Sequence, residues 1–253
     1  MSEGIVASTS GGVVFAFIIL VVPAAIYFGA LAAKKRRERY AQLAAHLGMQ
    51  LDFEDVVGIR ESGFGLFDDG HSRKVVALLR GDDDGPGAGQ LRCAFEYRYT
   101  TGSGDSEQVH RFLGAMLNVS ARVPRMNIGR EVLGGKLLGA IGMRDIEVES
   151  GEFNAAFRVK GEDEKLAFAV LDGALQEWLL AQQIVDWRNI ELLGEHLLVV
   201  RSGNDIEMIP KVLDFAKQFR DRIPDVVSSM YPAAHAVTPP QPPLPPTQNP
   251  GAN

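Results

Sequence analysis

The sequence predicts an α+β domain behind a single transmembrane helix, and three observations lead to this prediction. An uncharged apolar stretch near the N-terminus is long enough to cross a bilayer. The centre of the chain alternates apolar and polar residues as β-strands do, and later segments repeat apolar residues at helical spacing. The strands read as hairpins, so we expect an antiparallel or mixed sheet with helices packed on one side.

The apolar stretch is residues 13–33, VVFAFIILVVPAAIYFGALAA, which carry no charge. At a rise of about 1.5 Å per residue they span roughly 30 Å, the thickness of the hydrocarbon core of a bilayer. Two other readings stay open. A buried core helix rarely runs this long without a polar side chain, and a cleaved secretory signal has a basic n-region, which residues 1–12 lack. The sequence therefore predicts one transmembrane helix.

Five cations follow the apolar stretch and set its orientation: Lys34, Lys35, Arg36, Arg37 and Arg39. Lysine and arginine resist translocation and stay in the cytoplasm, and the other flank has neither. We therefore expect a single-pass protein of the cell (inner) membrane, with its N-terminus outside and its C-terminal domain cytoplasmic. The same five residues are the candidate contacts to the lipid bilayer, because basic residues near anionic headgroups contribute about 1 kcal/mol each.

The rest of the chain divides by composition. The Pro-rich C-terminus has too few apolar residues to offset the entropy of ordering it, so it is expected to be disordered. The predicted organisation is a short extracytoplasmic tail (1–12), the transmembrane helix (13–33), a basic helical stalk that stops near Gly48 (34–48), an α+β soluble domain (49–231) and the disordered tail (232–253).

Strands are predicted from period-two patterns. In QLRCAFEYRYT, residues 90–100, Cys93, Phe95, Tyr97 and Tyr99 point one way, and Glu96 lies among the polar residues of the other face. After the turn TGSGDS, the segment EQVHRFLGAMLNV (107–119) is predicted to return as the second strand of a hairpin. A second hairpin is predicted for NIELL and HLLVVR, with its turn at Gly194-Glu195. Two further strands are predicted at RKVVALLR (73–80) and at the short segment DIEVES.

Helices are predicted where apolar residues recur at spacings of three and four. Pro224 is expected to kink or end the last of them. The segments are 130–142, 163–182 as one or two helices, and 206–227, while GDDDGPGAG (81–89) reads as a loop.

Four segments carry a resemblance to a known family: AFEYRYTTGSG (94–104), RDIEVESGEFNAAFRV (144–159), ALQEWLL (174–180) and DFAKQFRDRIP (214–224). With the apolar span and basic stalk, the region 73–224 resembles a family of uncharacterised bacterial single-span membrane proteins whose soluble part is a domain of unknown function. The resemblance implies a membrane location and an undetermined activity, and it offers no catalytic motif to transfer. The GDDDGPGAG insertion and the Pro-rich tail depart from the family pattern.

Charge and motif content narrow the function classes. The net charge is −6, and it is −11 when the five cations are set aside, which disfavours nucleic acid as a partner. Cys93 is the single cysteine, so neither an intramolecular disulfide nor a thiolate cluster can form. The five histidines have no partner at metal-ligand spacing. We therefore predict no metal, no cofactor and no catalytic residue.

The favoured hypothesis is a non-catalytic, membrane-anchored module that binds a membrane-associated protein, a peptide or a lipid. Two alternatives stay open. One is a hydrolase whose site assembles from dispersed residues, using His110 or His196 beside a carboxylate. The other is a structural or assembly factor of the cell envelope, which would suit a Pro-rich tail outside the cell. Oligomeric state is not predicted.

Overall fold

The computed structural model describes residues 10–82, 91–130, 143–182 and 187–233, with side chains from Ile26 onward. It divides into two compact units, Met1–Leu51 and Asp52–Asn253. Three predicted features lie outside the described residues: most of the GDDDGPGAG loop, nearly all of the 130–142 helix, and the tail from residue 234.

The first unit is built on α1 (Ser10–His46), which joins the predicted span and the predicted basic stalk in one continuous helix. The helix stops where predicted, because Gly48 has φ +63°, a left-handed conformation that glycine adopts without strain. Among the described residues, no helix is both long enough and apolar enough to cross a membrane. The side chains of residues 13–25, most of the predicted span, lie outside those residues.

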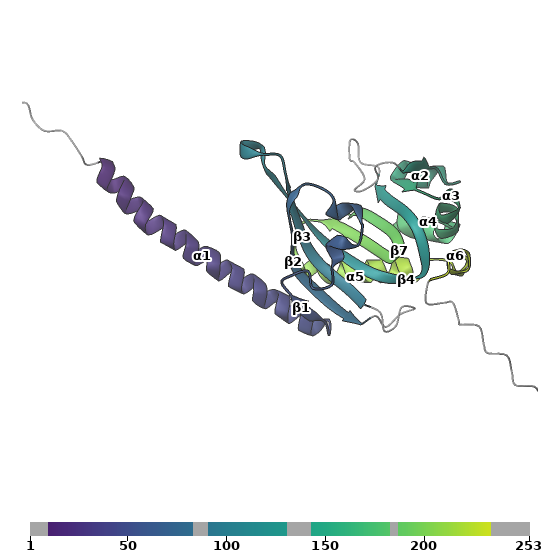
Figure 1. Ribbon diagram of the computed structural model, residues 1–253, viewed down its shortest axis with the longest axis horizontal. Helices are drawn as coiled ribbons and strands as arrows, with labels where there is room; N and C mark the ends of the chain where they lie inside the picture. The colour runs from purple at the N-terminus through teal and green to yellow at the C-terminus, as the bar shows by residue number, and fades with distance from the viewer. Residues whose placement is uncertain (1–9, 83–90, 131–142, 183–186, 234–253) are drawn as a thin grey trace, which may run out of the picture. The chain divides into compact units, whose positions relative to one another are not determined.

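The second unit contains an antiparallel sheet, which confirms the predicted α+β class (Figure 1). Within this unit the strand order is β2-β3-β4-β6-β5, and β7 also pairs with β4. The strands are β2 (His71–Asp82), β3 (Leu91–Thr101), β4 (Gln108–Arg130), β5 (Arg144–Ile146), β6 (Phe157–Gly161) and β7 (Trp187–Ser202), and a three-residue strand β1 (Gln50–Asp52) precedes them.

Strand β4 is the axis of the sheet. Its first half pairs with β3 and its second half with β6, while β7 follows it from Phe112 to Ile128. The register with β7 slips between Asn118 and Val123, and again before Met126. Such irregularities bend a strand and re-aim its side chains, and the irregular residues 119–123 of β4 supply part of the lining of the candidate site.

The predicted hairpin at 101–106 is confirmed, and the predicted hairpin at Gly194 is wrong. Gly102 has φ +80°, and a Cβ there would lie 2.4 Å from the Ser106 carbonyl oxygen, so only glycine fits that turn. Gly194 also has a positive φ, of +59°, but it lies inside the continuous strand β7 opposite Val123. The left-handed conformation of Gly194 therefore accompanies the register shift between β4 and β7, and the chain does not reverse direction there.

Both faces of the sheet are covered. One face packs on residues 53–70, which include the 3₁₀ turns η1 (Ile59–Glu61) and η2 (Gly65–Phe67), and Phe64, Phe67, Phe95 and Tyr97 are buried together there. The other face packs on α5 (Ile209–Arg220), which contacts β3, β4 and β7. Glu96, predicted on a polar face, is consequently fully buried, because α5 covers that face.

Short helices close the far end of the sheet. The predicted 163–182 region forms two helices, α3 (Glu164–Val170) and α4 (Gly173–Ala181), whose N-caps Asp163 and Asp172 accept backbone N–H bonds. In α2 (Gly151–Ala156), Phe153 stacks on Phe157 at 4.8 Å, although Phe157 already begins β6. The 206–227 prediction resolves into the 3₁₀ turn η4 (Ile206–Met208), α5 and α6 (Asp225–Met230), with Pro224 as the break.

Candidate binding pocket

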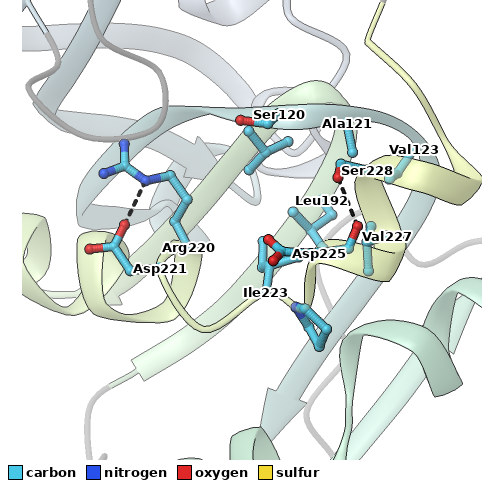
Figure 2. A pocket seen from close by; sticks show the side chains of 12 residues that line it. Ser120, Ala121, Val123, Leu192, Arg220, Asp221, Ile223, Asp225, Val227 and Ser228 are labelled. Carbon is cyan, nitrogen blue, oxygen red and sulfur yellow. Dashed lines mark hydrogen bonds and ion pairs between the residues drawn. The ribbon is translucent and has the colours of Figure 1, made fainter.

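A cavity of about 130 Å³ opens where the irregular part of β4 meets the turn between α5 and α6 (Figure 2). We call it the α6 pocket. Its inner wall is apolar, and five of the side chains that form it are at most 5% exposed. The apolar lining comes from β4, from β7, from the α5–α6 turn and from α6: Val119, Ala121, Val123, Leu192, Ile223, Pro224 and Val227.

The polar groups of the pocket lie toward its mouth. Asp225 and Ser120 are exposed, and Ser228 is half-buried, its hydroxyl donating to the Asp225 carbonyl oxygen at 2.8 Å. Arg220 is 5% exposed and its Nε lies 3.1 Å from Asp221 Oδ1. In Figure 2 the Arg220 guanidinium points away from the centre of the pocket. The mouth therefore presents hydrogen-bond acceptors.

The C-terminal end of α6 is fastened to the sheet beside this pocket. The Arg122 N–H donates to the Tyr231 carbonyl at 2.8 Å, and Pro232 bridges to Ala121 of the pocket wall. The Tyr231 hydroxyl donates to Asp163 Oδ2 at 2.5 Å. Desolvation and this bond raise the pKa of Tyr231 to about 12, and the bond lowers the pKa of Asp163. These contacts hold α6 in place as one wall of the pocket.

A second cluster of polar side chains lies on the opposite face, under residues 58–68. Glu191 and Asn189 of β7 are at most 1% exposed, and Arg125 Nε lies 3.4 Å from Glu191 Oε1. The Arg125 guanidinium also donates to the Gly63 carbonyl, and the Gly65 N–H donates to Glu191. These contacts tie the 53–70 segment to β4 and β7.

Burial raises the pKa of Glu191 to about 7, although the nearby Arg125 charge opposes the shift. A carboxyl that titrates near neutrality is a feature of many acid–base sites. This one is fully buried, so substrate does not reach it. We therefore assign the cluster to the attachment of the 53–70 segment.

The shift makes the stability of the second unit depend on pH. The unfolded carboxyl ionises near pH 4.5, whereas folded Glu191 keeps its proton until about pH 7, so ionisation favours unfolding across that window. The free energy of unfolding of the wild type, compared with that of the Glu191→Gln variant, should fall by ~3 kcal/mol between pH 4.5 and 7. Above pH 7 the difference between the two proteins should stay constant. Urea unfolding followed by the fluorescence of the two tryptophans, Trp178 and Trp187, measures this, with the exposed Glu177→Gln as control. Parallel curves for all three proteins would contradict it.

The five predicted membrane-contact residues all lie on α1. Lys34, Lys35, Arg37 and Arg39 are exposed, as a surface role requires. Arg36 is half-buried, and its guanidinium lies 3.5 Å from the Tyr40 hydroxyl and above the ring of that tyrosine at 5.5 Å. The cluster is thus presented on one helix, apart from the α6 pocket in the sequence.

The two histidines of the hydrolase alternative lie outside the lining of the α6 pocket, and His196 lines a separate hollow together with the neighbouring Glu195. His110 Nε2 lies 2.8 Å from Thr101 Oγ1 and its ring packs near Tyr99. His196 faces the Asn118 amide at 3.4 Å, and burial lowers its pKa. Over the described ranges, no group of three or more His, Cys, Asp or Glu side chains could hold a metal ion. Burial also raises the pKa of the Cys93 thiol to about 12, which leaves it unreactive.

Comparison with known proteins gives one informative likeness. No family model matches the chain, and no curated protein matches it. Among solved structures, it is similar to the crystal structure of the mycobacterial trehalose monomycolate transport factor A, TtfA, with a TM-score of 0.53 and 11% sequence identity. The likeness covers 73% of this chain and 92% of that one. The predicted family of single-span membrane proteins stays a prediction, and what the likeness establishes is a shared fold.

Proposed function

We propose that the chain is a membrane-anchored protein whose second unit lies in the cytoplasm and acts as a non-catalytic binding module in a lipid-related transport process. The observation that carries the proposal is the α6 pocket: an open, apolar-walled cavity with no histidine, cysteine or lysine among its lining residues. Such a lining is suited to binding and offers no general base of neutral pKa.

Two further observations support the role. The basic cluster after the uncharged stretch 13–33 favours a cytoplasmic second unit beside the membrane. The structure with the same fold is that of a protein named as a transport factor for trehalose monomycolate. Tethering also suits a binding module, because confinement at the membrane raises the effective concentration of a partner there.

The test combines position-specific cross-linking with lipid analysis in the native host. A photo-reactive side chain is placed at Ser120 on the mouth of the pocket, and at the exposed Asp105 on the β3–β4 hairpin as the control. We expect one reproducible adduct at Ser120 and none at Asp105. Deleting the gene should alter the lipid composition of the envelope, and the full chain should restore it. An unchanged composition, together with equal cross-linking at both positions, would contradict the proposal.

A further inference from the structure

We propose that the α6 pocket receives the side chain of a lysine or arginine from a basic segment of a partner protein. This inference rests on the proposed function and deepens it by naming the chemistry of the occupant. It follows from the size of the cavity, the nature of its wall and the charge at its mouth.

The size of the pocket limits what enters it. A dry cavity of roughly 150 Å³ in a protein interior holds a single benzene ring, and the α6 pocket measures about 130 Å³. One amino-acid side chain fits such a volume, whereas the body of a lipid does not. The pocket is therefore an anchoring site for one side chain of a larger partner.

The buried wall of the pocket is apolar, whereas two of its exposed lining residues are acidic. Val123, Leu192 and Val227 are at most 4% exposed and form an apolar wall suited to an aliphatic chain. Asp221 and Asp225 are exposed residues of the lining. Arg220 pairs with Asp221, whereas Asp225 has no ion pair to its carboxylate among the described residues. Lysine and arginine combine an aliphatic stem with a cationic head, and they bury the stem while the head stays near water.

The charge of the whole chain favours a protein segment over a lipid headgroup. Outside the basic cluster the chain carries a net charge of −11, which attracts basic segments and repels anionic headgroups. Quaternary ammonium headgroups are recognised by cages of aromatic rings. No phenylalanine, tyrosine or tryptophan is among the residues that line this pocket. The α6 pocket therefore suits a primary ammonium or guanidinium group carried on an aliphatic stem.

The experiment uses the full chain in phosphatidylcholine nanodiscs and two fluorescent peptides of Gly and Ser that carry five cations each. One peptide carries lysine and the other carries 2,4-diaminobutyric acid, whose stem is two methylene groups shorter, and the assay is run at pH 6 so that both peptides are cationic. Fluorescence anisotropy should show the lysine peptide binding about tenfold more tightly, because only its stems reach the apolar wall. If the two peptides bound with equal affinity, the binding would depend on charge alone and the proposal would be overturned.

Matched variants locate the site. Asp225→Asn should weaken binding of the lysine peptide by about tenfold, as expected for a lost charge-assisted contact. Asp105→Asn removes the same charge from the hairpin tip and should leave the affinity unchanged. Equal effects of the two variants, or no binding at all, would overturn the proposal. Cross-linking at Ser120 and the lipid analysis test the proposed function separately, because neither requires a basic occupant.

Discussion

Replacing Gly114 by alanine is expected to destabilise the second unit by ~2–3 kcal/mol, the cost of forcing an extra methyl group into a packed core. Gly114 of β4 lies opposite Phe95 of β3. A Cβ at Gly114 would lie 2.4 Å from Cζ of Phe95 and within 3 Å of two more atoms of that ring. The ring has no room to retreat, because Phe95 is fully buried and packs against Phe67. The absence of a side chain at Gly114 is what lets Phe95 lie across the strand.

The measurement is the urea midpoint, followed by tryptophan fluorescence, because one of the two tryptophans, Trp178, packs on Phe215 of α5 at 5.0 Å. Gly151→Ala is the matched control, since a Cβ at Gly151 has no atom within 4 Å and the residue begins a helix. That variant should unfold at or slightly above the wild-type midpoint. Adding Phe95→Leu to Gly114→Ala should recover part of the loss by shrinking the clashing ring. Equal midpoints for the two alanine variants would refute the argument.

The strands that could be predicted from the sequence are those whose pattern is local. Cys93, Phe95, Tyr97 and Tyr99 alternate strictly, and all four are buried on one face of β3 as predicted. The same rule failed for Glu96, because burial of the opposite face depends on α5, which lies more than a hundred residues later in the chain. Periodicity indicates which side chains share a face; it does not indicate how many faces are covered.

Gly194 illustrates a second limit. A glycine between two apolar runs is typical of a hairpin turn, but a bulge requires the same backbone conformation. The two differ in whether the flanking runs pair with each other or with a third strand. Here both runs pair along β4, from Phe112 to Ile128. Only the long-range pairing decides between the two.

The candidate site shows the same division between local and distant information. The basic cluster on α1 could be predicted, because it is a contiguous run with a chemical meaning of its own. The α6 pocket could not, because its walls come from β4, β7, the α5–α6 turn and α6, and most of its lining residues are of common types such as Val, Leu, Ser and Asp. For the buried cluster the sequence held one signal, Glu191 inside the apolar run NIELL, but the same pattern fits a solvated strand face.

The second large effect concerns orientation, on which the proposed function depends. With alkaline phosphatase fused after Asn253, the wild type should be inactive, because the enzyme folds only outside the cytoplasm. Replacing the five cations of α1 by serine, together with Ser8→Lys and Ser10→Lys, should raise activity by on the order of tenfold. The substitutions move the basic residues from one flank of the apolar stretch to the other, and the flank that holds them stays inside.

The control separates charge from side-chain identity. A variant with lysine at Arg36, Arg37 and Arg39 keeps all five charges and should keep the fusion inactive. If the wild-type fusion were already active, the second unit would lie outside the cell, and an envelope spacer would explain the chain better than a cytoplasmic binding module. If the wild type and the charge-swapped variant were both inactive, the basic cluster would not set the orientation. In that case residues outside the basic cluster would determine the side of the membrane on which the α6 pocket lies.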